Sequence, residues 1–413
     1  MQKYADSLSS KLPVFAAIIT VVTVLAIGTF MRGSLTNAWH LFRIPSQSPT
    51  FTDTRSITHS IDCLAAGQDP YAVGTFDPFH RLFSYPPIWL QLRYLGVTSR
   101  STNLIALIMS VITASAFLLL FRAQTWLSAF VVFFAVISRP VLFAVERGNI
   151  DQLIFSLLVF GFFLIDQQKT QLKPLLTGLL IVFLTILKVY PFVAAAVFIR
   201  RRNGLIKAAL TATLSVAALA LTSGRRLPLL FANTPRDYNL SFGSFPFFLA
   251  MSRHTFHATT PIILHHGKAA PMGAIILGVL SLIAAAIYSK QIDRALPVLD
   301  CDRARGCIAI SCLTIFCFAF IFGSSYDYRL IFLLGALAYL VEDLNKSVSL
   351  RSLPAAILIL LLLWGPFYLS LRHEIPDGLV FVMASAWLGN SLFRRTASRE
   401  SAALLQTEPL KSI

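Results

Sequence analysis

Residues 101–121 read STNLIALIMSVITASAFLLLF, a run without a single charged side chain. The hydrocarbon core of a bilayer is ~30 Å thick, and a helix rising ~1.5 Å per residue needs ~17–25 apolar residues to cross it. Because backbone groups in lipid must satisfy their own hydrogen bonds, such a run predicts a transmembrane helix. Comparable runs recur along the chain, at residues 14–31, 150–165, 205–222, 272–288, 307–322, 354–371 and 379–393.

The composition agrees with a membrane protein. Of the 413 residues, 56% are hydrophobic and 13% charged, with a mean hydropathy of +0.71, whereas soluble chains carry roughly 25% charged residues. The apolar runs do not alternate with polar residues as the strands of an outer-membrane barrel do. The sequence therefore predicts an all-α, polytopic transmembrane bundle.

The net charge of +16 comes from Lys and Arg in short loops beside apolar runs. This placement indicates loops retained in the cytoplasm rather than a nucleic-acid-binding surface. Three basic clusters, at 200–207, 290–305 and 394–399, are expected to be cytoplasmic. Two long polar segments, 32–100 and 223–270, then lie on the extracytoplasmic side. The first apolar run is not followed by a small-residue cleavage site, so we expect a retained anchor.

This topology is consistent only if residues 175–199 enter the membrane, break at Tyr190-Pro191 and return, since proline ends a helix. We expect about 11–13 membrane segments in the cell membrane, with both termini cytoplasmic. Residues 1–393 are expected to form one domain, followed by a short cytoplasmic tail over 394–413. The five cysteines include no CxxC pair and are expected to be small core residues.

The first long polar segment, 32–100, exceeds the length of a simple connector. Residues 58–66 have helical spacing, and Gly67 with Asp69-Pro70-Tyr71 predicts the end of that helix and a turn. An amphipathic stretch begins at Tyr85-Pro86-Pro87 and contains Trp89 and Tyr94. Such a stretch is suited to lying at the membrane interface.

An ordered set of motifs runs through roughly residues 10–345. Its members are Asp53, Gly67-Gln68-Asp69-Pro70-Tyr71, Phe83-Ser84-Tyr85-Pro86-Pro87, Arg147-Gly148-Asn149-Ile150-Asp151-Gln152, Leu187-Lys188-Val189-Tyr190-Pro191, Asn239-Leu240-Ser241 and Ser325-Tyr326-Asp327-Tyr328-Arg329-Leu330. In its order and placement this set resembles glycosyltransferase family 87, a branch of the GT-C superfamily of polyprenyl-phosphate-sugar-dependent membrane enzymes.

The resemblance implies a GT-C-type bundle whose two long outer loops carry short helices. It implies transfer of a hexose or pentose, mannose above all, from a polyprenyl phosphate to a glycolipid or glycan at the outer face. Asp53 would be the general base, and Arg329, Lys188 or Arg147 would contact phosphate. The other expected substrate-binding residues are Tyr85, Asn149, Gln152, Tyr190, Asn239 and Asp327. Asp53 and Asp62 are not adjacent, so no metal is expected, although a divalent ion stays open.

Each candidate also has a structural alternative. Asp53 could cap a helix, with Asp62 as the rival base, while Asp69 fits a turn. A lysine at mid-bilayer costs ~2.5–3.5 kcal/mol, so Lys188 is functional unless it snorkels to the interface. The remaining alternatives are an Arg147–Glu146 pair, helix capping by Asn149 and Gln152, interface anchoring by Tyr85, salt bridges of Asp327 and Arg329, and plain polar surface for His59. The histidines that suggest a metal lack a matching carboxylate or cysteine: His254, His257, His265 and His266.

Two other classes of function stay open. A transporter or flippase of lipid-linked sugars would show related halves and functional residues near the bilayer midplane. The polar candidates here instead gather at the extracytoplasmic ends of the predicted helices. A scaffold subunit that kept the fold and lost the activity is the third alternative.

Overall fold

The computed structural model describes residues 8–201, 203–234, 240–249, 269–322, 325–346, 350–365 and 371–393. These residues form helices, joined by one short antiparallel pair of strands in which Ser241 faces Tyr326 and Phe242 faces Ser325. The predicted all-α, polytopic architecture is therefore confirmed. The predicted tail over 394–413 and the four histidines between 254 and 266 lie outside the described residues.

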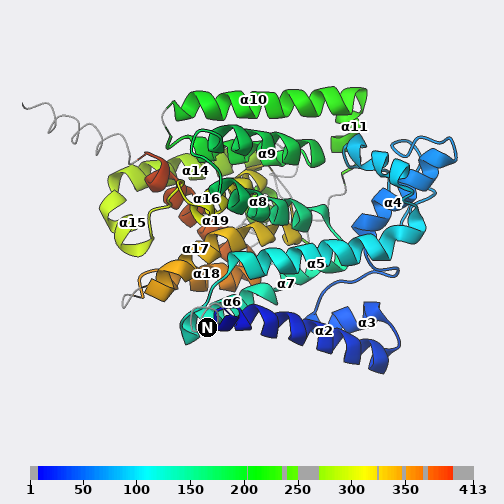
Figure 1. Ribbon diagram of the computed structural model, residues 1–413, viewed down its shortest axis with the longest axis horizontal. Coiled ribbons are helices and arrows are strands. Elements are labelled where there is room, and N and C mark those ends of the chain that lie inside the picture. The colour runs from blue at the N-terminus through cyan, green and yellow to red at the C-terminus, as the bar shows by residue number, and fades with distance from the viewer. Residues whose placement is uncertain are drawn as a thin grey trace, which may run out of the picture.

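Many of the described helices follow one another along the chain with short connections (Figure 1). The first half contains α2 (Leu12–Arg32), α3 (Leu35–Trp39), η1 (His40–Phe42), α4 (Thr52–Ala65), η2 (Pro87–Leu95), η3 (Ser99–Ser101), α5 (Thr102–Leu120), α6 (Trp126–Val136), α7 (Arg139–Arg147), α8 (Ile150–Asp166), α9 (Lys173–Leu187), η4 (Tyr190–Phe198) and α10 (Gly204–Ser223). The second half contains η5 (Gly224–Arg226), α11 (Leu227–Ala232), β1 (Ser241–Phe242), α14 (Ala269–Ile287), α15 (Ser289–Ala295), α16 (Ala304–Ile321), β2 (Ser325–Tyr326), η6 (Asp327–Phe332), α17 (Leu333–Lys346), α18 (Leu353–Leu363) and α19 (Leu371–Phe393).

The bundle has a buried centre and an apolar outer surface. Most of α16 is buried, whereas α2 and α10 lie along opposite edges in Figure 1 and bury about a fifth of their residues. Large apolar side chains on these outer helices point away from the protein; Phe30 is 91% exposed and Leu221 86%. Water would oppose so much exposed apolar surface and lipid does not, so the outside of the bundle is suited to a bilayer.

Six segments of the described chain are long and apolar enough to cross a membrane by themselves. They are Leu12–Arg32, Ser99–Leu120, Trp126–Arg147, Gly204–Ala232, Ala270–Ile287 and Ala304–Ile321. The apolar helices α9 and α18 are shorter. The chain is therefore a multi-pass membrane protein. The count of about 11–13 segments, the single domain over 1–393 and the cytoplasmic termini stay predictions.

One end of the bundle collects basic side chains. The Lys11 ammonium group donates to the carbonyl oxygen of Phe121 at 2.8 Å, and Arg305 Nε donates to that of Leu120 at 3.1 Å. These contacts bring the start of α2, the end of α5 and the start of α16 together. The first long loop and α4 lie at the opposite end (Figure 1).

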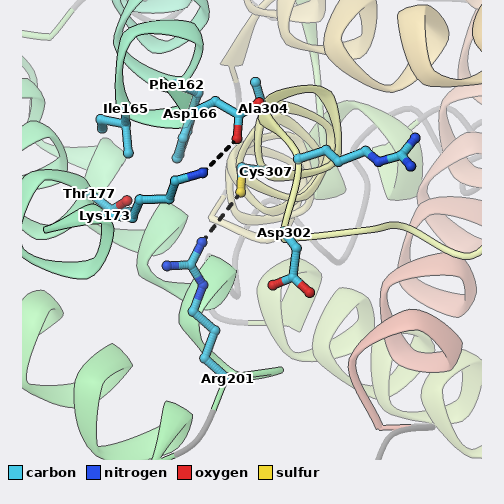
Figure 2. Close-up of a pocket in the computed structure, with 10 residues that line it drawn as sticks. Phe162, Ile165, Asp166, Lys173, Thr177, Arg201, Asp302, Ala304 and Cys307 are labelled. Atoms are coloured by element: carbon cyan, nitrogen blue, oxygen red, sulfur yellow. Dashed lines mark hydrogen bonds and ion pairs between the residues drawn. The ribbon is translucent and has the colours of Figure 1, made fainter. Parts of the chain in front are cut away.

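The segment from α9 to η4 enters the bundle and returns to the basic end. Figure 2 shows Lys173, where α9 begins, and Arg201, just after η4, lining the same small pocket. The predicted break and return are therefore present within the bundle, but the break comes at Lys188 and not at Tyr190-Pro191. The helix stops at Leu187, and Lys188 is extended, with φ −156° and ψ 138°. Pro191 lies in the first turn of η4, where its missing N–H removes no hydrogen bond.

The helix expected over 58–66 begins earlier, at Thr52. Phe51 precedes it with a positive φ of 61°, and its backbone N–H donates to the Glu146 carbonyl oxygen at 3.0 Å. This contact ties the start of α4 to the end of α7. Asp53 consequently lies in the first turn of α4, next to the turn between α7 and α8.

Gly148 forms that turn and is expected to tolerate no side chain. Its φ is +57°, and a Cβ atom there would lie 2.2 Å from the Thr54 hydroxyl oxygen on α4. Gly96 has a similar φ of +73° but open space around it. We predict that Gly148→Ala lowers thermostability in lipid nanodiscs by more than Gly96→Ala. The positive φ lowers the stability of either alanine variant by about 1–2 kcal/mol. Each kcal/mol lowers the melting temperature by roughly 2–4 °C, and the contact with Thr54 adds to the loss at Gly148. Equal losses in the two variants would contradict a close contact at Gly148.

Candidate active site

Four segments that are distant in the sequence meet at the end of the bundle opposite the basic pocket. They are the start of α4, the α7–α8 turn, the break after α9, and η6. Each contributes charged or polar side chains that are at least four-fifths buried. Burial of so many charges is tolerated only when they pair with one another, so their mutual contacts define the site.

Asp53 is the carboxylate that α4 brings to this cluster. Its position in the first turn is favourable, because a helix N-terminus attracts negative charge. The Asn149 side-chain amide donates a hydrogen bond to Asp53 Oδ2. Asp53 Oδ1 lies 3.4 Å from Arg81 Nη1 and 3.7 Å from Arg147 Nε. The residue keeps 6% of its surface exposed.

The α7–α8 turn places two of the predicted residues, Arg147 and Asn149, on either side of Gly148. Arg147 ends α7, Gly148 makes the left-handed turn, and Asn149 caps α8 by accepting the backbone N–H of Asp151 at 2.8 Å. Asn149 thus caps its helix, as the structural alternative held, and also contacts Asp53. The structural alternative for Arg147 was an ion pair with Glu146. The guanidinium group instead pairs with Asp53. Glu146 accepts a hydrogen bond from the Ser46 hydroxyl group at 2.6 Å.

Arg81 holds the first long loop over Asp53. Its guanidinium group pairs with Asp77 at 2.9 Å and donates to the backbone carbonyl oxygen of Thr52. Burial opposes the charged form of Arg81, but the hydrogen bond to Asp77 and the charge of Asp53 outweigh it and raise the Arg81 pKa. Arg81 therefore stays charged and fixes the loop against the start of α4.

Asp151, in the first turn of α8, is a second carboxylate and is fully buried. It forms an ion pair with Lys188 and accepts a hydrogen bond from the Tyr190 hydroxyl group. Its other oxygen lies 3.3 Å from Arg329 Nε. Lys188 also reaches the Asn149 side-chain oxygen at 3.4 Å, which links the surroundings of Asp151 to those of Asp53.

Lys188 owes its place to the break in the helix. The carbonyl oxygen of Leu187, freed by the end of α9, accepts a hydrogen bond from Trp89 Nε1 of η2 at 2.9 Å. The first long loop therefore covers the break. Lys188 is 9% exposed and buried among other groups of the site, so snorkelling to the interface does not describe it.

Arg329 is positioned by the strand pair. β2 pairs with β1 of the second long loop, and η6 begins directly after β2. The Arg329 guanidinium group donates to the Ser325 hydroxyl oxygen at 2.8 Å as well as approaching Asp151. The salt-bridge alternative for Arg329 thus describes its contact, with α8 as the partner element.

Tyrosine rings surround the Lys188 ammonium group. It lies 5.6 Å from the ring centre of Tyr85, 5.8 Å from that of Tyr190 and 5.9 Å from that of Tyr328, distances at which cations and rings attract. Burial raises the pKa of Tyr85 well above its ordinary value. Its phenol therefore remains a neutral hydrogen-bond donor, and Tyr85 lies inside the site rather than in an exposed aromatic belt.

Two predicted residues lie apart from these contacts, and one is not described. Gln152 is buried and donates to the Ala144 carbonyl oxygen at 3.2 Å, so it joins α8 to α7. The Asp327 backbone N–H donates to the Leu240 carbonyl oxygen at 3.0 Å, and its side chain is fully buried. Asn239 lies outside the described residues.

The rival acids have structural partners. Asp62 accepts the backbone N–H of Ser99 at 3.1 Å. Asp69 accepts that of Tyr71 at 3.1 Å, as expected for its turn, and pairs with Arg226 at 2.7 Å. His59 Nε2 is buried without a hydrogen-bond partner in the described part of the chain. Within the described residues no group of three or more His, Cys, Asp and Glu side chains could hold a metal ion.

Asp151, Arg81 and Tyr328 were not singled out as site residues from the sequence. Asp151 and Tyr328 stood inside two of the quoted motifs, and the presence of a carboxylate at the start of an apolar helix was a usable signal. Arg81 sits in a polar loop among other charges, and nothing in the sequence connects it to Asp53.

The comparison with known families gives one match. The family model of glycosyltransferase family 87 matches residues 75–302, more than half of the chain. Arg81, Tyr85, Arg147, Asn149 and Lys188 lie within the match, whereas Asp53 and Arg329 lie outside it. A search of curated proteins found no match. The match over most of the chain, together with the multi-pass helical fold, shows that this protein belongs to glycosyltransferase family 87 and is a membrane glycosyltransferase.

Proposed function

We propose that the protein transfers a hexose or pentose, with mannose as the first candidate, from a polyprenyl phosphate to a glycolipid or glycan acceptor on the extracytoplasmic face. The observation that carries this proposal is the position of Asp53. It is a carboxylate with 6% of its surface exposed, held among cations at the end of the bundle opposite the basic pocket. A lipid-anchored donor presents its phosphate and sugar at such an end of a membrane protein.

Both carboxylates have partners at both oxygens, and their exposure is what supports different roles. Asp151 is fully buried, and both of its oxygens are engaged by Lys188, Tyr190 and Arg329. Asp53 retains exposed surface, and a general base must reach the proton that it removes. Asp53 is therefore the better candidate for accepting the proton of the acceptor hydroxyl group.

The transfer requires one displacement at the anomeric carbon. The acceptor oxygen forms a bond to that carbon while the bond from the carbon to the phosphate oxygen breaks. The bonding electrons leave with the phosphate, which gains a negative charge, and Asp53 takes the proton. The products are the glycosylated acceptor and polyprenyl phosphate.

The leaving phosphate needs cations or N–H donors that stabilise its growing charge. Arg147, Lys188 and Arg329 lie around the two carboxylates. Arg147 Nε is buried and makes no hydrogen bond within the described residues, its 3.7 Å separation from Asp53 being too long for one. This donor is available to a phosphate oxygen.

We predict that Asp53→Asn reduces transfer about 10²–10⁴-fold, since the amide cannot take the proton. The measurement uses purified protein in lipid nanodiscs with labelled polyprenyl-phosphate mannose, other hexoses and pentoses, and a membrane glycolipid extract as acceptor. Asp62→Asn is the matched control, because Asp62 is on the same helix but contacts the backbone of Ser99. Native rates in a folded Asp53→Asn protein would exclude Asp53 as the base.

We predict that Arg147→Gln lowers kcat/KM for the donor roughly 10²-fold, as loss of one donor to a developing anion does. Arg226→Gln is its control, since Arg226 pairs with the exposed Asp69 at the same end of the protein. If both variants showed the same small loss, Arg147 would not contact the phosphate.

A further inference from the structure

The charge of Asp151 is unused by the transfer step. This carboxylate is fully buried, approaches two cations from different parts of the chain, and accepts the Tyr190 hydroxyl group. A buried carboxylate that only connected helices could be replaced by neutral groups. Asp151 instead neutralises cations that are expected to hold the donor phosphate.

We propose that Asp151 is a specificity-determining residue that sets the positive charge of the site so that the monoanionic donor is held and the dianionic product is released. This inference rests on the proposed function. It assigns no proton transfer to Asp151, and it concerns the difference in affinity between two phosphates that share one polyprenyl tail.

The charges of the two ligands differ by one. A polyprenyl-phosphate sugar is a phosphodiester and carries one negative charge. Polyprenyl phosphate is a phosphomonoester whose second ionisation has a pKa of about 6, so it carries nearly two negative charges at neutral pH. The cations that favour the transition state therefore also favour the product over the donor, and retention of the product would slow turnover.

Asp151 opposes this retention because of where it lies. The contact network described above contains the cations Arg81, Arg147, Lys188 and Arg329 and the carboxylates Asp53, Asp77 and Asp151. Removal of the Asp151 charge adds one unit of positive charge beside Lys188 and Arg329. In a site of low dielectric, such a unit acts more strongly on a dianion than on a monoanion.

The side chains around Asp151 are not expected to change charge in the pH range where the phosphate does. From the α9–η4 segment these are Lys188 and Tyr190, from η6 they are Tyr328 and Arg329, and from the outer loop it is Tyr85. None of these side chains has an ordinary pKa near 6. Glu146 is a buried acid next to Arg147. A change in ligand preference around pH 6 is therefore assigned to the phosphate when it persists in Glu146→Gln.

The test compares equilibrium binding of two probes with the same tail, polyprenyl phosphate and its methyl phosphodiester. Native protein and Asp151→Asn are studied in lipid nanodiscs, and the measured quantity is the ratio of the two dissociation constants. We expect Asp151→Asn at pH 8 to shift this ratio about tenfold towards the dianion. At pH 5, where polyprenyl phosphate is largely a monoanion, the shift should vanish. A general loss of structure would weaken both probes and leave the ratio unchanged.

Two further variants guard against misfolding. Lys188→Gln removes one positive charge and should shift the ratio of the two dissociation constants towards the monoanion. The double variant Asp151→Asn with Arg329→Gln has the native net charge and should show the native ratio. Unchanged ratios at pH 8 in these variants, or failure of native protein to bind either probe, would overturn the inference. Sugar transfer by native protein is measured in a separate assay. If the variants shift the binding ratio as expected but native protein transfers no sugar, only the proposed function is refuted.

Discussion

The cost of burying charge in a membrane bundle is the constraint on which the rest of this structure depends. A charged side chain inside the bundle is tolerated when an opposite charge meets it. Here the partners come from segments far apart in the sequence: Asp53 meets Arg147, and Asp151 meets Lys188 and Arg329. Pairing these charges therefore also fixes how α4, α7, α8 and η6 meet.

The same pairing makes the two carboxylates different. Asp151 lies one residue into α8, deep in the bundle, and its oxygens are engaged by groups from both α9–η4 and η6. Asp53 lies in the first turn of a helix of the outer loop, where Arg81, Arg147 and Asn149 contact it, and it keeps 6% of its surface exposed. The two carboxylates thus differ in their partners and in their burial.

The fold could be predicted further than the site. Apolar runs such as 101–121 depend only on local composition, so the helices and their membrane setting followed from the sequence. Asp53 and Arg147 could be selected through the family resemblance, and Lys188 also because a lysine inside an apolar run is rare. Their partners could not, since the contact of Arg81 with Asp53 and that of Asp151 with Arg329 are made across long sequence separations. The position of the break at Lys188 depends on the contacts of Trp89 with Leu187 and of Lys188 with Asp151. These contacts cannot be predicted from the position of Pro191.

That break explains how a lysine can be part of such a site. Had α9 continued through Lys188, the Leu187 carbonyl oxygen would have bonded within the helix, and the Lys188 side chain would have projected outward from the helix axis at its helical position. The chain instead becomes extended at Lys188, and Trp89 from the outer loop takes over the freed carbonyl oxygen. The ammonium group is then directed at Asp151 and surrounded by tyrosine rings. The loop that carries Asp53 therefore also stabilises the backbone that presents the cation, which couples the expected base and the expected phosphate contact through one structural element.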